Sequence, residues 1–160
     1  MPSSLSLNGY IDIVCHMKVE NLRSPYEKTG GIVYFARMID KIRLHAEGKL
    51  PSDYQANLGS GFDGRCCSFL GIDYPPFVDR VKQGASDVEM LEWAFAHGRK
   101  PTDEQIEIWV DFMRKRGWND EASDILKRRL REGNFEDRTD IQTMFDYIDL
   151  DEGRDPRNRA

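Results

Sequence analysis

The stretch that decides the fold runs from residue 22 to residue 50 and reads LRSPYEKTGGIVYFARMIDKIRLHAEGKL. Its apolar residues recur at helical spacing, at Tyr34, Phe35, Met38, Ile39 and Ile42. A broad apolar face of this kind is typical of a helix packed on a core. We therefore expect a helix from Ile32 to Glu47 that is ended by Gly48. Because this stretch also gathers the most polar side chains, we expect any chemistry to centre on it.

The rest of the chain reads as a series of helices. Residues 51–61 indicate a loop, residues 62–70 a short buried helix, and Pro75-Pro76 the start of a helix that ends at Gly84. Three capping boxes, each a hydroxyl followed three residues later by Glu or Gln, predict further helix starts at Ser86, Thr102 and Thr139. Helix ends are expected at Gly98, Gly117 and Gly133. The predicted fold is mainly α, at least half helical, with a minor N-terminal β-strand element.

The N-terminal segment has a different pattern. Residues 10–19 alternate with a period of two, which is typical of a strand. An open apolar edge is rarely tolerated, so this strand is expected to pair, either with a segment elsewhere or across a homodimer. The predicted organisation is an arm over residues 1–21, a single helical domain over 22–152 and a frayed tail over 153–160.

Composition narrows the class of protein. Charged residues make up 32% of the chain and apolar residues 39%, which suits thin helical layers with charged outer faces. Residues 1–85 carry 10 Lys and Arg against 9 Asp and Glu, whereas residues 86–160 carry 13 against 19. Because an acidic C-terminal half repels phosphate backbones, we expect no nucleic-acid partner.

Cysteine usage and hydropathy predict a cytoplasmic location. The chain has three cysteines, Cys15, Cys66 and Cys67, and this odd number implies no disulfide framework. Reduced thiols are typical of intracellular proteins. No run approaches the roughly 20 apolar residues that cross a bilayer, and the first ten residues lack the features of a signal peptide. We therefore expect no membrane partner.

The candidate ligand-binding residues lie on or next to the predicted 32–47 helix. Arg37, Lys41 and His45 are four residues apart and form one cationic stripe, which suits a substrate carboxylate or phosphate. Gly30 and Gly31 would let backbone N–H groups approach the anion at the helix start. The simpler interpretation is a solvated charged face, since exposed charge runs usually serve solubility.

The candidate catalytic residues are carboxylates and a tyrosine. Asp40 or Asp63 would be the acid or base, with Tyr54 or His45 assisting proton transfer. Arg43 completes the ligand-binding set, although Asp40 three residues earlier is also a local partner for it.

Cys66 and Cys67 follow Arg65, and a thiolate beside an arginine can be nucleophilic. Buried structural cysteine is nevertheless the favoured interpretation. No CxxC, HxxxH or HExxH motif exists, so we predict neither a metal site nor a cofactor. The segment FDYIDLDEG lacks the pattern of a calcium loop and is interpreted as a solvated helix end.

Several strings occur in order along most of the chain. They are LRSP (22–25), GGIV (30–33), RMIDKIR (37–43), GK followed by Tyr54, FLGID (69–73), QGASDVEMLEW (83–93) and FDYIDLDEGR (145–154). Together they resemble a bacterial family known as domain of unknown function 5069, and residues 1–20 resemble an addition to the typical family start. The resemblance implies a compact cytoplasmic bacterial protein without an established activity, and it points again to Arg37, Asp40, Lys41 and Arg43.

Two functions are compatible with these patterns. The first is a small-molecule binding protein, or a metal-independent enzyme, for an anionic or carboxylated ligand anchored by Arg37 and Lys41. The alternative is a non-catalytic interaction domain or homodimeric module that pairs through the 10–19 arm. An enzyme is expected to enclose a pocket lined by Arg37, Lys41 and Tyr54, whereas an interaction module leaves these residues flat, solvated or at a subunit contact.

Overall fold

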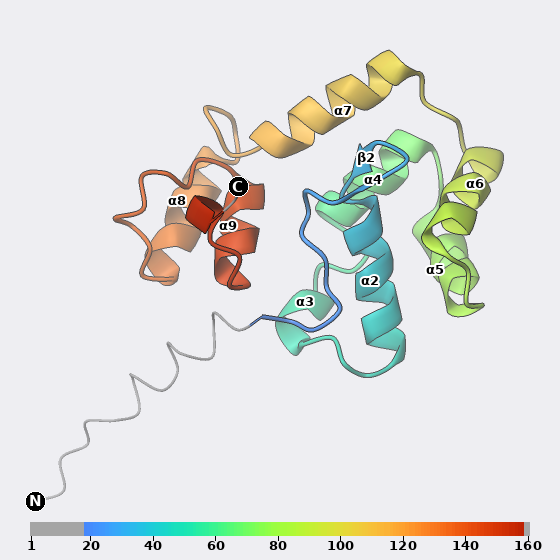
Figure 1. The fold of residues 1–160 in the computed structure, drawn as a ribbon, viewed down its shortest axis with the longest axis horizontal. Helices are drawn as coiled ribbons and strands as arrows, with labels where there is room; N and C mark the ends of the chain where they lie inside the picture. The colour runs from blue at the N-terminus through green and yellow to red at the C-terminus, as the bar shows by residue number, and fades with distance from the viewer. Residues whose placement is uncertain (1–17, 159–160) are drawn as a thin grey trace, which may run out of the picture. The chain divides into compact units, whose positions relative to one another are not determined.

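The computed structural model describes residues 18–158 (Figure 1). Helices make up 56% of these residues, which confirms the mainly α fold. The chain divides into two compact units, one of residues 21–113 and one that includes residues 114–158. The prediction of a single helical domain over 22–152 stays a prediction. Residues 10–17 of the predicted strand lie outside the described residues, and Lys18 and Val19 form no strand.

The first unit begins with a small hairpin. Strand β1 (Lys28–Thr29) pairs antiparallel with β2 (Ile32–Val33), and Thr29 lies opposite Ile32. Gly30 and Gly31 form the two-residue turn with φ of +56° and +82°, the positive values that a type I′ turn requires. The predicted helix start at Ile32 is therefore wrong, because these glycines reverse the chain and residues 32–33 pair as a strand.

Five further helices follow the central helix α2 (Phe35–Ala46) in this unit. They are α3 (Ser52–Gln55), α4 (Phe62–Leu70), α5 (Tyr74–Lys82), α6 (Asp87–His97) and α7 (Asp103–Lys115), whose last two residues belong to the second unit. The apolar face of α2 is buried, and Phe35 meets Phe77 of α5 edge to face with ring centroids 5.7 Å apart. The 62–70 helix is confirmed, whereas the predicted 51–61 loop contains α3.

Most of the predicted helix boundaries agree with the structure. The boxes at Ser86 and Thr102 form, with the Glu89 and Gln105 backbone N–H groups donating to their hydroxyls at 3.2 Å. Helices α2, α5, α6 and α7 each end one or two residues before the expected glycine. These boundaries were predictable because a cap and a stop are both local in sequence.

The second unit contains α8 (Ser123–Glu132), α9 (Met144–Asp151) and a 3₁₀ turn (Pro156–Asn158). Its core consists of Leu126, Leu130, Ile141 and Leu150. The capping box predicted at Thr139 is wrong. Thr143 caps α9 instead, accepting a bond from the Asp146 N–H at 3.2 Å. No helix among the described residues is long and apolar enough to cross a membrane.

Candidate functional site

The polar side of α2 is buried. Arg37, Asp40 and Lys41 are only 4–6% exposed, whereas His45 near the helix end is exposed. A solvated face is therefore the wrong interpretation for the first two members of the predicted stripe. Arg37 donates from Nη1 to the backbone oxygen of Arg23 at 3.1 Å, so it helps to hold the segment before β1 against α2.

Lys41 belongs to a buried polar cluster with Asp63 and Tyr34. The Lys41 Nζ and the Tyr34 hydroxyl donate to the same Asp63 oxygen at 2.8 and 2.7 Å. The Gly59 N–H donates to the other carboxylate oxygen at 3.0 Å. Burial, followed by the negative charge of Asp63, raises the pKa of Tyr34 well above its usual value, so the hydroxyl stays a donor. Two predicted site residues, Lys41 and Asp63, thus meet as an ion pair inside the unit.

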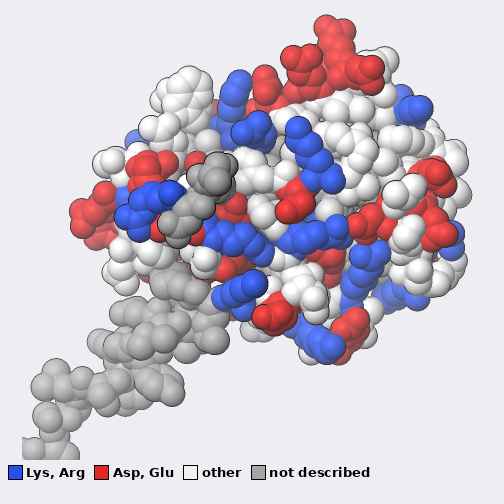
Figure 2. Space-filling model, viewed as in Figure 1, with Lys and Arg blue, Asp and Glu red and all other residues white. Residues whose placement is uncertain are grey.

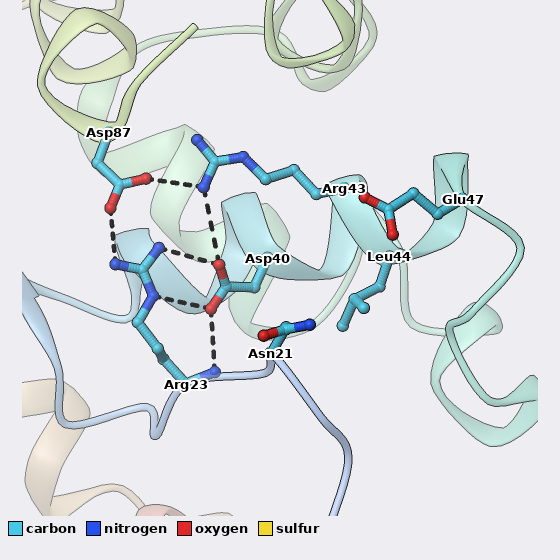
Figure 3. A pocket seen from close by; sticks show the side chains of 7 residues that line it. All are labelled: Asn21, Arg23, Asp40, Arg43, Leu44, Glu47 and Asp87. Carbon is cyan, nitrogen blue, oxygen red and sulfur yellow. Dashed lines mark hydrogen bonds and ion pairs between the residues drawn. The ribbon is translucent and has the colours of Figure 1, made fainter. Parts of the chain in front are cut away.

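Asp40 and Arg43 belong to a different cluster, which we call the charge ring: Arg23, Asp40, Arg43 and Asp87 (Figure 3). Cations and anions alternate around it. Arg23 contacts Asp40 at 2.8 Å and Asp87 at 2.6 Å, and Arg43 contacts Asp87 at 3.1 Å and Asp40 at 3.9 Å. The ring joins the segment before β1, helix α2 and the first turn of α6.

The contacts within the ring favour the charged forms of Arg23 and Asp87. Hydrogen bonds from Arg23, together with the charges of both arginines, hold the pKa of Asp87 below its usual range. Bonds to Asp40 and then Asp87 raise the pKa of Arg23 further above its already high value. Arg23 therefore carries a full charge at any physiological pH.

A pocket of about 450 Å³ opens beside the charge ring. Its remaining lining residues are Asn21, Leu44 and Glu47. Figure 3 shows the Arg43 side chain running from α2 toward Asp87 and Asp40. Arg43 also donates from Nη2 to the Ala85 backbone oxygen at 2.9 Å. Its Nε has no partner in the part of the chain that the structure describes.

Gly30 and Gly31 line a second pocket, of about 380 Å³. The opposite wall is α7, which contributes three carboxylates and two apolar side chains: Asp103, Glu107, Asp111, Ile106 and Val110. Lys28 is the one cation among the lining residues of this pocket. The glycine pair therefore lies beside acidic groups, and it lines a different pocket from Asp40 and Arg43. Glycine is required at position 30 because φ is positive there and a Cβ would overlap the Leu91 side chain.

The other predicted residues lie apart from both pockets. Tyr54 is half-buried on α3 and lines neither of the two pockets. Cys66 and Cys67 are buried on α4, and burial raises the pKa of Cys66 well above its usual value and that of Cys67 to about 11. Both thiols are therefore protonated near neutral pH and poor nucleophiles. Among the described residues no group of His, Cys, Asp or Glu has the arrangement of a metal site.

The sequence matches the family described as Domain of unknown function (DUF5069) over residues 19–154. The chain belongs to this family. The matched range includes the whole unit of residues 21–113 of this DUF5069 member and residues 114–154 of the other unit, and it begins close to the end of the segment interpreted as an addition. No curated protein matches the chain.

Sequence reasoning missed Arg23, Asp87 and Tyr34 as members of the polar clusters. Arg23 and Asp87 are 64 positions apart, and no local pattern brings them together. A signal was present, because both lie within strings that carry the family resemblance, LRSP and QGASDVEMLEW. The interpretation of residues 145–153 as a solvated helix end is also wrong. Asp149 and Glu152 are buried there, and Arg154 contacts them at 3.4 and 2.8 Å.

Proposed function

We propose that this chain binds a small carboxylated ligand in the pocket beside the charge ring. The proposal rests on the position and the hydrogen bonds of the Arg43 side chain. Its guanidinium is held in place by Asp87 and the Ala85 carbonyl, yet its side chain is 37% exposed and its Nε–H has no partner among the described residues. A fixed guanidinium with free donors is well suited to a carboxylate, because little side-chain entropy is lost when the ligand binds.

The remaining members of the ring support Arg43 rather than contact the ligand. Arg23 donates from Nε and both terminal nitrogens to Asp40, Asp87 and the Ala36 carbonyl. Asp40 and Asp87 balance the two guanidinium charges, so the two arginines can lie side by side. Leu44, whose exposed fraction is 4%, adds an apolar wall to the pocket. A short ligand with a carboxylate and a few methylene groups fits this lining.

Binding is better supported than catalysis. The carboxylates proposed as acid or base, Asp40 and Asp63, each accept several hydrogen bonds from cations or N–H groups. A proton acceptor in a reaction needs a lone pair directed at the substrate, and these groups direct theirs at the protein. A metal-independent enzyme stays the secondary proposal, with Tyr54 and His45 as assistants.

Isothermal titration calorimetry with succinate, and with succinamide as its uncharged analogue, tests the binding proposal. We expect succinate to bind and succinamide not to bind. Arg43→Gln should weaken succinate binding at least about tenfold, because it removes the charged donor. The control is Arg128→Gln, since Arg128 is another helical arginine with a nearby carboxylate but lies on α8. Equal succinate affinity for Arg43→Gln and the wild type would contradict the proposal.

The alternative function, a homodimer formed through residues 10–19, rests on the alternating sequence pattern alone. Under that proposal, deletion of residues 1–20 converts a dimer into a monomer with an intact helical core. Light scattering that finds a full-length monomer at micromolar concentration would rule it out. We also propose that the protein is bacterial and cytoplasmic and that it has no nucleic-acid partner. The acidic C-terminal half and the thiols support this proposal.

A further inference from the structure

An aromatic stack joins α4 to α7 in the first unit. The rings of Phe69 and Trp109 lie 4.6 Å apart and are almost parallel, at 4°. Trp109 is buried, and its Nε1 donates to the Val33 backbone oxygen at 3.3 Å, which fixes the stack to the hairpin. The base of this region is therefore anchored by ring packing and by a hydrogen bond.

Two arginine guanidinium groups lie over aromatic rings of α4 and α7. The Arg99 guanidinium lies over Phe69 at 5.5 Å, and the Arg65 guanidinium lies over Phe112 at 5.3 Å. Arg99 also donates from Nε to the Phe69 backbone oxygen at 2.8 Å. Neither arginine has a carboxylate partner among the residues that the structure describes. Both side chains are exposed, so two oriented cations remain available on a chain of net charge −5.

Large apolar side chains are exposed on α7, and one of them is the Phe112 ring that Arg65 covers. Phe112 is 40% exposed and Ile108, one turn earlier on α7, is 62% exposed. We call the whole set the arginine–aromatic surface: Arg65, Phe69, Arg99, Ile108 and Phe112. Exposed aromatic and arginine side chains on a rigid base are the composition typical of the residues that dominate binding energy at protein interfaces.

We propose that the arginine–aromatic surface binds a short acidic segment of a partner protein. Two carboxylates of that segment would pair with Arg65 and Arg99, and an apolar side chain between them would cover Ile108 and Phe112. Charge complementarity argues for this occupant, because stacking on a ring leaves the N–H edges of a guanidinium free for a carboxylate.

The surroundings of the surface limit the length of the partner segment. Asp103, Glu107 and Asp111 follow one side of α7, and Figure 2 shows acidic side chains gathered along this helix. A long polyanion, such as a nucleic acid, would meet these carboxylates and be repelled. A short acidic peptide carries fewer charges and meets less of this repulsion than a polyanion does.

Fluorescence anisotropy of the full chain with a labelled six-residue peptide that alternates glutamate and leucine tests the proposal. We expect saturable binding that weakens as salt rises, because the ion pairs are exposed. The double variant Arg65→Gln with Arg99→Gln should lose at least about tenfold in affinity. Phe112→Ala should weaken binding while leaving the salt dependence in place. The matched control is Arg80→Gln on α5, whose guanidinium bonds Gln83, and it should bind as the wild type.

Four results would overturn the inference. One is unchanged affinity in the double arginine variant, and another is equal binding of a peptide with glutamine in place of glutamate. A third is tighter binding of an oligothymidine of equal charge, which would identify a nucleic-acid surface. The last is a dimer in sedimentation that the double variant abolishes while the peptide stays unbound, which would identify a second copy of the chain as the occupant.

Discussion

At the scale of single residues, the balance between burial and pairing decides the role of each charge. Lys41 and Asp63 have side chains that are 5% and 0% exposed, and each satisfies the other. Charges removed from water in this way are costly unless they are paired and hydrogen-bonded. No buried side-chain nitrogen or oxygen among the described residues lacks a hydrogen-bond partner. The sequence analysis named Lys41 and Asp63 as candidates for separate roles, but no helical pattern shows that their side chains meet inside the unit.

Removing one member of this buried pair should destabilise the protein strongly. Lys41→Met keeps the length of the side chain and leaves the Asp63 charge without its cation. We expect a loss of about 3–5 kcal/mol in the free energy of unfolding, measured by urea denaturation. The control is Lys49→Met, which removes an exposed ion pair with Glu47 and should cost less than about 1 kcal/mol. Equal losses in the two variants would show that the buried pair has no special role.

At the scale of elements, local signals were predictable and long-range ones were not. The start of α6 is determined by Ser86 and Glu89, three residues apart, and the sequence alone identifies it. The hairpin was missed because its strands are two residues long, too short for a period to show. Thr139 has the spacing of a capping box, but residues 139–140 form a turn next to Arg138, which bonds both Asp140 and Asp155. The bonds between Arg138 and the distant Asp155 therefore prevail over the local capping signal at Thr139.

The two threonines before α9 give a direct comparison of a formed and an unformed cap. Thr143→Ala should lower the free energy of unfolding by about 1 kcal/mol, because the Asp146 N–H loses its acceptor. Thr139→Ala should change it by less than about 0.5 kcal/mol, since this exposed residue begins no helix. Circular dichroism during chemical denaturation measures both. A larger loss in Thr139→Ala would mean that the earlier cap forms after all.

At the scale of the whole molecule, acidic pH should destabilise the first unit through the charge ring. The pKa of Asp87 is lowered in the folded state, so the carboxylate stabilises the fold above its unfolded pKa of about 3.9. This stabilisation is lost as pH falls from that value through the lower folded pKa. Asp87→Asn should flatten the acid side of a stability–pH profile, whereas Asp53→Asn, at an exposed position on α3, should not. Parallel profiles for Asp87→Asn and the wild type would contradict the ionic role of Asp87.

The candidate site depends on the tertiary fold of the whole first unit. Its residues come from the segment before β1, from α2 and from the start of α6, and the family match includes all three. Asp40 and Arg43 could be selected from the sequence because they share a polar helix. Periodicity does not select their partners Arg23 and Asp87, although both lie in strings that carry the family resemblance, since only the tertiary fold closes the ring. The pocket therefore depends on positions that composition and periodicity do not connect.

The most direct test of the ligand proposal is the NMR signal of the Arg43 side-chain Nε–H group during a succinate titration. This group has no partner in the described part of the chain, so a bound carboxylate should shift it progressively and to saturation. The assignment is confirmed by loss of the signal in Arg43→Gln. A saturable shift at Arg43, with the Arg128 signal unchanged, is the predicted result. An Arg43 signal that stays in place while succinate reaches millimolar concentration would contradict the account.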